Sequence, residues 1–362
     1  MSRTTEAEGT IERPQRGPFW QTLNERLALS SLAYPVPDHA NSLSYLLGGI
    51  TLGGFIILIL TGIILAQFYN PDPAAAHQSI VYMVTRASLV DFVRSLHFWT
   101  ANLVVVSLLL HLGRVFATGS YKRPREINWL VGVALLAVTL GFVFTGTVLK
   151  WDQEAVEALA HNREIGDLLG IWGVWFTSEF TLSVPILTRL YLGHVTLLPA
   201  AFTVLIGVHL FLVKQLGISP KAGAEATSGP PTADQGGSQF SLHVRKMVGF
   251  GLLLLAVAGG LALIFPAELG QPGIVGAEVT KPPWMFLPIY PLEDVFGIRG
   301  LLISTIVLLG LLASVPFIDR SPWLSPQRRR WIIAAGALGL AVAVGLGAYA
   351  WFSRPVAHLM GG

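Results

Sequence analysis

Seven long apolar segments constrain the fold of this chain more than any other feature. The hydrocarbon core of a membrane is about 30 Å thick, and a helix of about 20 apolar residues spans it. Only helices and closed barrels satisfy the polar backbone groups in lipid. Charged residues make up 12% of the 362 residues, whereas soluble domains carry about 25%. We predict an all-α integral membrane protein with seven transmembrane helices, at residues 44–68, 92–116, 127–149, 188–213, 246–265, 299–317 and 331–352.

A linker divides the chain between its fourth and fifth apolar segments. The run GISPKAGAEATSGPPTADQGGSQ (217–239) is rich in Gly, Ser, Pro and Ala, which is typical of a flexible tether. Near the N-terminus, the run FWQTLNERLAL (19–29) has helical apolar spacing and predicts a short helix on the membrane surface. The predicted regions are an N-terminal segment, a four-helix domain, a linker and a three-helix domain, at 1–43, 44–216, 217–243 and 244–362.

The distribution of basic residues predicts the orientation in the membrane. Sixteen of the 24 Lys and Arg residues fall on the side of the N-terminus, and cytoplasmic loops carry the excess of such residues. We therefore expect a bacterial-type cytoplasmic membrane, with the N-terminus and the linker cytoplasmic and the C-terminus outside. Lipid is then the surrounding partner, and a net charge of only +3 argues against a nucleic-acid partner.

The complete lack of cysteine excludes several kinds of chemistry. Without a thiol, this chain itself forms no disulfide, zinc-thiolate site, iron–sulfur cluster or thioether-linked haem. A redox role for the chain therefore needs ligands of another kind.

Four histidines lie inside the apolar segments, where an ionisable side chain indicates function. His97 and His111 are 14 residues apart, and His194 and His209 are 15 apart. At about 100° per residue, the two histidines of each helix face the same side of it, about 21 Å apart along its axis. Both helices run in the same direction, so we expect two levels, His97 with His194 outside and His111 with His209 inside. The remaining histidines are predicted to be solvated surface residues: His39, His77, His161, His243 and His358.

Two imidazoles per level fit one kind of ligand best. Imidazole binds zinc, copper and iron, but a zinc or copper site needs further protein ligands, whereas a planar macrocycle needs two axial ones. We therefore predict two non-covalent haem b groups within the four-helix bundle. A transporter or purely structural subunit would not need such pairs.

Glycines and arginines extend the same pattern. Four glycines repeat the 14-residue spacing on the other two helices of the bundle, and a flat haem edge needs a helix face without side chains. The alternative is ordinary small-residue helix packing. Two arginines each lie about one helical turn beyond a histidine, towards the nearer membrane interface. They can pair with haem propionates, or their side chains simply reach the interface. These residues are Gly48, Gly62, Gly132 and Gly146, and Arg94 and Arg114.

These residues and their flanking motifs resemble the cytochrome b family of the quinol-oxidising bc and b6f complexes. The motifs are SLHxxxANL…HLGR (95–114), TGTVLKWDQ (145–153) and LTRLYLGH (187–194), and GGITL (48–52) leans towards the b6f type. In the second half, VPFIDR (315–320) resembles the companion subunit of b6f complexes. The resemblance covers roughly residues 18 to 352.

The resemblance implies a function and partners. It implies two haems in series between an outer quinol-oxidising pocket and an inner quinone-reducing pocket, with electron-transfer activity that requires partner subunits. It also implies a Rieske iron–sulfur protein, a c-type cytochrome and a homodimeric core. The alternative is a haem b conduit with a quinone site in a membrane redox complex without a Rieske protein.

Departures from the family pattern concentrate at the outer pocket. KPPWMFL (281–287) stands where the family has Pro-Glu-Trp-Tyr, so Pro283 and Met285 replace the family's proton-accepting glutamate and its tyrosine. Leu46 and Thr147 replace a cysteine and a tyrosine of relatives. Candidate proton acceptors are Glu278, Glu293 and Asp294, and each is otherwise a solvated loop acid; candidate quinol-pocket residues are Pro283, Trp284, Met285, Phe286 and Trp151.

Overall fold

The protein is a bundle of membrane-length helices. A computed structural model describes residues 17–27, 35–177, 180–220 and 237–356. Within these ranges, seven helical spans are long and apolar enough to cross a membrane, which confirms the predicted all-α membrane fold. They are α2 (Leu43–Ala66), α4 (Ser88–Ala117), α5 (Glu126–Val148), α7 (Ile186–Leu192) continued by η6 (Gly193–Leu197) and α8 (Leu198–Leu216), α9 (Phe240–Ile264), α11 (Ile298–Ile318) and α12 (Arg330–Phe352) with η7 (Pro326–Arg329) before it.

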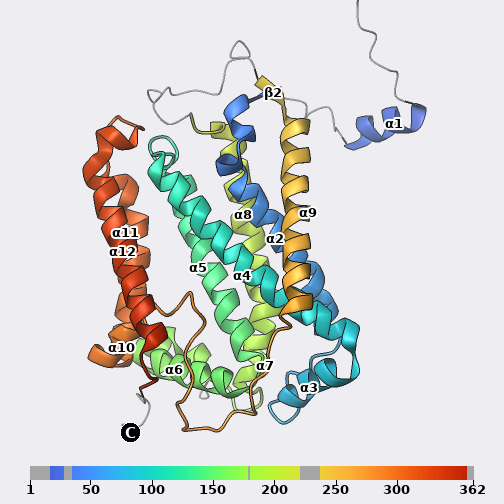
Figure 1. Ribbon diagram of the computed structural model, residues 1–362, viewed down its shortest axis with the longest axis vertical. Coiled ribbons are helices and arrows are strands. Elements are labelled where there is room, and N and C mark those ends of the chain that lie inside the picture. Colours follow the sequence, from blue (N-terminus) through green and yellow to red (C-terminus); the bar gives the residue numbers. More distant parts are fainter. Residues whose placement is uncertain (1–16, 28–34, 178–179, 221–236, 357–362) are drawn as a thin grey trace, which may run out of the picture.

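Shorter elements close the two ends of the bundle (Figure 1). One end carries α3 (Ala76–Arg86), α6 (Gln153–Leu169) and α10 (Pro291–Phe296), and we call it the α6 end. The other end carries two antiparallel strands, β1 (Pro35–Pro37) and β2 (Gly237–Gln239), and we call it the strand end. The remaining short elements are α1 (Pro18–Leu27), η2 (Asp38–Asn41), η3 (Gly170–Trp172) and η4 (Val174–Phe176).

The predicted linker is only partly a connection. β2 and the first turn of α9 both lie inside the range 217–243, because α9 begins at Phe240. At its start, the backbone carbonyls of Ser219 and Pro220 accept hydrogen bonds from His39 Nε2 (3.0 Å) and Tyr45 Oη (3.1 Å). Residues 221–236 lie outside the described part of the chain.

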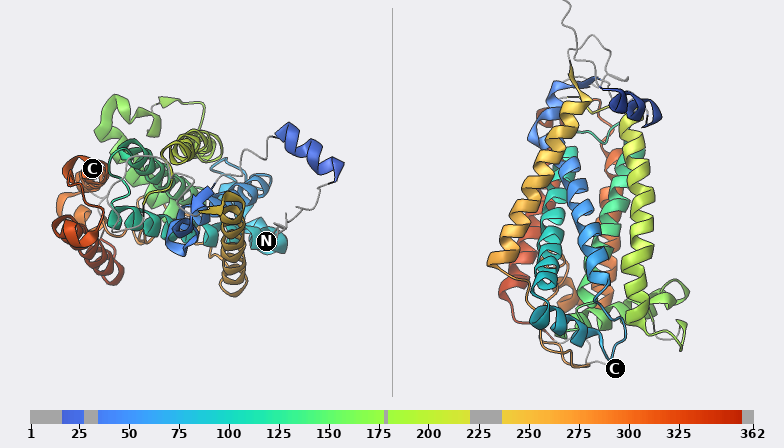
Figure 2. Two further views of the ribbon diagram at one scale, coloured as in Figure 1. Left: turned by 90° about the horizontal axis from the view of Figure 1, so that it is seen from above. Right: turned by 90° about the vertical axis from the view of Figure 1, so that its right-hand side faces the viewer.

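The helices pack in two groups that share a central apolar core. α2 packs against α4, and α9 packs against both, while α5 packs against α8. Seen from above, α11 and α12 lie on one flank of this bundle, and α11 contacts α5 and α6 (Figure 2). One side chain from each of α2, α4, α5 and α8 meets in the middle: Phe55, Val104, Leu135 and Phe202. The Phe55 and Phe202 rings lie 4.1 Å apart, centroid to centroid.

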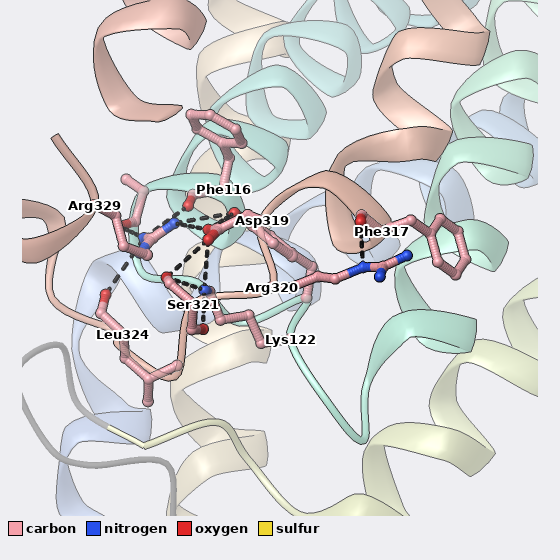
Figure 3. A network of polar contacts seen from close by, with 10 residues as sticks. Phe116, Lys122, Phe317, Asp319, Arg320, Ser321, Leu324 and Arg329 are labelled. Carbon is pink, nitrogen blue, oxygen red and sulfur yellow. Dashed lines mark hydrogen bonds and ion pairs between the residues drawn. The ribbon is translucent and has the colours of Figure 1, made fainter. Parts of the chain in front are cut away.

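A buried ionic network ties the three-helix half to the four-helix half at the strand end (Figure 3). Asp319 follows α11 and accepts hydrogen bonds from Lys122 Nζ (2.7 Å), Tyr121 Oη (2.6 Å) and Arg329 Nη1 (3.0 Å). Ser321 also bonds to this carboxylate, at 2.8 Å. Burial alone would raise the pKa of Asp319, but these donors outweigh it and lower the pKa to about 2.

Candidate functional site

The four membrane histidines form two levels in the four-helix bundle. α4 carries His97 and His111, and the continuous helix η6–α8 carries His194 and His209. His97 interacts electrostatically with His194, and His111 interacts with His209. The first pair lies towards the α6 end and the second towards the strand end. The phenylalanines of the central core belong to the region between the two levels.

Each histidine lies against one glycine on a neighbouring helix. A Cβ added to Gly48 or Gly62 of α2 would lie 3.0 Å from His111 Cε1 or 3.6 Å from His97 Cε1, respectively. A Cβ on Gly132 or Gly146 of α5 would lie 3.8 Å from His209 Cε1 or 3.2 Å from His194 Cε1. The 14-residue glycine spacing therefore places bare backbone beside every imidazole of both levels.

Two threonines orient the imidazoles at the α6 end. Thr61 Oγ1 donates to the Ile57 carbonyl at 2.8 Å and lies 2.8 Å from His97 Nδ1. Thr145 Oγ1 donates to the Gly141 carbonyl at 2.7 Å and lies 2.8 Å from His194 Nδ1. Because each hydroxyl proton is used by a carbonyl, each threonine oxygen accepts from Nδ1–H. This leaves the Nε2 lone pair of both imidazoles available to a metal.

Sequence reasoning missed these threonines, although a signal was present. Each stands directly before one of the predicted glycines, so that the dipeptide Thr-Gly occurs at 61–62 and again at 145–146. The repeat places a hydroxyl and a bare backbone position side by side on both helices.

A π-helical turn explains why the two histidine spacings differ by one residue. His194 lies in η6, a turn of π-helix between α7 and α8. A π-helical turn takes up one more residue than an α-helical turn, and such turns concentrate at functional sites. The 15-residue spacing on this helix therefore acts like the 14-residue spacing on α4.

The arrangement fits two flat, anionic macrocycles with two axial ligands each. Within the described residues, no group of three or more His, Cys, Asp or Glu side chains could hold a metal ion without such a ring. At the strand end, the Arg114 guanidinium lies 3.4 Å over the Tyr45 ring, and its Nε and Nη2 are buried without a hydrogen-bond partner. A haem propionate would supply the missing acceptors.

Arg94 is held differently from Arg114. Its Nε and Nη2 donate to Asp91 at 3.0 and 2.8 Å, and Nη2 also donates to the Ala267 carbonyl. The role of Arg94 beside a propionate therefore stays a prediction, while its observed contacts join α4 to the chain after α9.

The predicted quinol-pocket residues fall into two places at the α6 end. Trp284 Nε1 donates to Asn102 Oδ1 at 2.7 Å, five residues after His97 on α4. Trp284 lies in a tight turn that is closed by a hydrogen bond from Phe286 N to the Pro283 carbonyl at 2.8 Å. Met285 lies half-buried in the same turn. Trp151 packs instead in an apolar cluster around Val148, Leu187 and Leu190, beside α5 and α7.

Two of the predicted acids converge on a histidine that we expected to be solvated. His161 Nε2 lies 3.2 Å from Glu278 Oε1 and 3.2 Å from Glu293 Oε1. The side chains of both glutamates are almost fully buried, at 2% and 0% exposure, and that of His161 is 14% exposed. Asp294, in contrast, is exposed. The expectation of solvated loop acids is therefore wrong for Glu278 and Glu293.

The other histidines predicted to be solvated are also more enclosed than expected. His243 is buried in α9, and His39 and His77 are half-buried and bond to backbone carbonyls. Segments distant in the sequence cover these histidines, as Ser219 does at His39 and Gly270 at His77. The local sequence around each histidine does not indicate such contacts. His358 lies outside the described residues.

Comparisons with known proteins point in one direction. Residues 102–272 match the family model described as Cytochrome b(N-terminal)/b6/petB. Cytochrome b6 of Heliobacterium modesticaldum is 35% identical over 54% of this chain and 93% of its own. The cytochrome bc complex cytochrome b subunit of Chlorobaculum thiosulfatiphilum is 33% identical over 79% and 68%. The menaquinol:cytochrome c reductase cytochrome b subunit of Bacillus subtilis is 33% identical over 58% and 94%.

A solved structure shares the fold over nearly the whole chain. It is described as a hyperthermophilic respiratory Complex III, with a TM-score of 0.77 and 22% sequence identity. The match covers 92% of this chain and 91% of the other, so it extends over both the four-helix and the three-helix halves.

Proposed function

This chain belongs to the cytochrome b/b6 family, a family of haem-binding electron-transport subunits, and we propose that it is the dihaem cytochrome b of a bc/b6f-type quinol oxidoreductase. The observation that carries the proposal is the double level of facing imidazoles, each backed by a glycine. Cytochrome b subunits with matching sequences belong to complexes named for menaquinol oxidation and for cytochrome bc.

The proposed haem sites use residues from all four helices of the first half. His97 and His194 would hold one haem b towards the α6 end, against Gly62 and Gly146. His111 and His209 would hold the second towards the strand end, against Gly48 and Gly132. When bound, each iron would take up and release one electron.

The chain's own residues would prepare these sites. Thr61 and Thr145 hold Nδ1 of two imidazoles and so aim Nε2 at the iron. Arg114 offers its two unpartnered nitrogens to a propionate. The Phe55 and Phe202 rings fill the space between the levels and exclude water from the path of the electron.

We place the quinol-oxidising pocket at the α6 end. The segment 281–287 folds into a turn there, and Trp284 bonds to Asn102 on the helix that carries both His97 and His111. A quinol held by Pro283, Trp284, Met285 and Phe286 would lie beside the first haem. The second quinone site would lie at the strand end, near Arg114.

The proposed partners and location follow from the relatives and the basic residues. A complex of this kind would add a Rieske iron–sulfur protein and a c-type cytochrome around a homodimeric core. Within the described residues, the strand end carries most of the Lys and Arg residues that lie outside the helices, and it would face the cytoplasm. The N-terminus and the linker would then be cytoplasmic and the C-terminus outside.

The haem ligands can be tested by substitution. We expect His97→Ala and His209→Ala each to lower the b-haem content of the purified protein from two to about one, because each removes an axial ligand from a different level. Pyridine haemochrome quantification against protein concentration measures this. His77→Ala, in α3 outside the bundle, is the matched control and should retain two. An unchanged haem content in both ligand variants would refute the assignment.

A second candidate function is a haem conduit in a membrane redox complex without a Rieske protein. Pro283 favours it, because proline cannot accept a proton where the resembling family has glutamate. EPR of the reduced, intact complex separates the two functions. A Rieske-type signal supports quinol bifurcation, and its absence from a preparation with both haems and all subunits supports the conduit.

A further inference from the structure

The haem sites leave one buried ionic cluster without a role. At the α6 end, α6 supplies His161, the chain before 281 supplies Glu278, and α10 supplies Glu293 (Figure 1). The two glutamate side chains are almost entirely removed from solvent. Ionised carboxylates at such depth need a compensating charge or a proton.

A third acid fixes the position of this cluster. Glu157, one helical turn before His161, accepts hydrogen bonds from Val279 N (2.9 Å), Thr280 N (3.0 Å) and Thr280 Oγ1 (2.6 Å). It therefore clamps the chain on the C-terminal side of Glu278 to α6. Glu157 is a positioning residue, because its oxygens are already engaged by these donors.

The contacts of His161 with two buried carboxylates point to a proton shared within the cluster. His161 Nδ1 lies 2.7 Å from the Glu157 backbone carbonyl, which can only accept, so Nδ1 carries a hydrogen. Nε2 faces two carboxylate oxygens at 3.2 Å. Two ionised carboxylates this close to one buried site would repel each other, so a proton on Nε2 or on one of the carboxyl groups stabilises the arrangement. In both cases one proton lies between the three groups.

The surrounding charges favour holding that proton. Burial of His161 opposes protonation, but its hydrogen bond to Glu293 and the charges of Glu293 and Glu278 outweigh burial and raise its pKa to about 9. From α6, Glu157 and Glu164 also face the cluster, and from the 290–294 region Tyr290 and Asp294 do so. Burial and the neighbouring acids raise the pKa of Tyr290, which therefore stays neutral.

The cluster brackets the proposed quinol pocket. Glu278 precedes the segment 281–287 and Glu293 follows it. Tyr290 interacts with both acids and packs against Leu287, the last residue of that segment. Both chain ends of the turn that would hold the quinol therefore lead to the same buried group of acids.

We propose that Glu278, His161 and Glu293 form a proton relay that takes up a proton from the quinol and passes it towards the outer surface. The proposal rests on the proposed quinol-oxidising function. The quinol O–H bond breaks, and an O–H bond forms on Glu278 or Glu293. The proton already held in the cluster moves on from His161. The two electrons would leave separately, one towards the haem held by His97 and His194, and one to a one-electron acceptor on a partner subunit. The second quinol O–H bond also breaks, and its proton would leave with the second electron to a basic group beside that acceptor.

Glu164 offers the exit from the relay. It lies three residues after His161 on the same helix, is half-buried, and interacts electrostatically with His161, Glu278 and Glu293. Burial and these neighbouring acids raise the pKa of Glu164, although His161 opposes the shift. The raised pKa favours brief protonation before release to water.

The test compares His161→Gln with His77→Gln in the intact, detergent-purified complex. The glutamine amide can still donate to the Glu157 carbonyl but cannot pass a proton on. We expect quinol-oxidation turnover to fall at least about tenfold in His161→Gln, with a larger solvent deuterium effect. The inflection that the imidazolium contributes on the alkaline side of the pH profile should disappear. His77→Gln makes the same change at a half-buried histidine of α3 that bonds to the Gly270 carbonyl, and it should keep the wild-type turnover and profile.

The possible outcomes distinguish failure of the relay from failure of the proposed quinol-oxidising function. Haem content and the reduced-minus-oxidised spectrum first establish that each variant is folded. If the wild type holds two haems but oxidises no quinol, the proposed function fails, and the relay with it. If the wild type is active and His161→Gln keeps its turnover and pH profile, the relay alone is overturned. If His161→Gln does not assemble, Glu278→Gln and Glu293→Gln test the relay by the same turnover and pH-profile measurements. The relay also predicts that each of these variants loses a carboxyl band in redox-difference infrared spectra.

Discussion

Each membrane histidine of this protein is matched to one glycine on a facing helix. The closest approaches are at Gly48 and Gly146, where an added Cβ would lie 3.0 and 3.2 Å from an imidazole carbon. Such contacts are tighter than ordinary van der Waals packing, so any side chain here must displace the imidazole or the group it binds. The proposed haem sites therefore depend on the lack of a side chain at these glycines as much as on the histidine ligands.

Filling one glycine position should remove one haem. We expect Gly146→Leu to lower the b-haem content from two to about one, because the new side chain takes the space beside His194. The matched control is Gly113→Leu on α4, an exposed position where an added Cβ meets nothing within 4 Å. Haem content per protein and the spectrum of the remaining haem give the result. Equal haem content in both variants would contradict the cradle role of Gly146.

At the scale of elements, the loops at the strand end hold the helices in place. The loop between α4 and α5 carries Tyr121 and Lys122, and the loop between α11 and α12 carries Asp319 and Ser321. All of these side chains meet around one carboxylate. The buried Arg329 also donates to the Phe116 (3.2 Å) and Ala117 (2.6 Å) carbonyls at the end of α4. α11 and α12 are therefore anchored to α4 and α5 by charge as well as by apolar contact.

Removing the central charge of this network should destabilise the protein. Asp319→Asn leaves Lys122 and Arg329 buried without their counter-ion, which costs about 3 kcal/mol or more. Unfolding in detergent, followed through haem absorbance or tryptophan fluorescence, should show a lower free energy of unfolding. Arg320→Gln is the matched control, because Arg320 is exposed and points away from the network towards the Phe317 carbonyl (Figure 3). A loss of stability in the control as large as in Asp319→Asn would argue against the network.

At the scale of the whole molecule, the two halves interlock rather than stand side by side. α9 packs against both α2 and α4, and Gly53 of α2 and Gly251 of α9 let those two backbones approach closely. The Asp319 network joins the halves again on the opposite flank. The covalent connection through 217–239 is thus one of several links between them.

The halves should assemble when the chain is cut. We expect residues 1–228 and 229–362, expressed as two chains in one cell, to co-purify with two b haems, because the contacts of α9 and of Asp319 do not depend on the linker. An affinity tag on the second chain and haem quantification measure this. Recovery of the tagged chain without haem would show that the linker is required.

The sequence by itself determined the features that follow from periodicity. Apolar length determined the seven spans, and helical repeat placed His97, His111, His194 and His209 on facing sides with glycines opposite. These inferences work because the positions within one helix obey a fixed period. The π turn at His194 changes that period locally and was not predicted from the residues.

The tertiary structure decided which residues outside the membrane spans meet. Glu278, Glu293 and His161 were all visible in the sequence, yet the histidine was expected to be solvated and the acids were only candidates. More than 110 residues separate His161 from either acid, and no period within one element can pair residues of α6, α10 and the loop before 281. Whether a charged group is solvated or buried depends on which chain folds over it. Here Glu157 bonds the segment before 281 to α6, and this segment helps to cover the cluster.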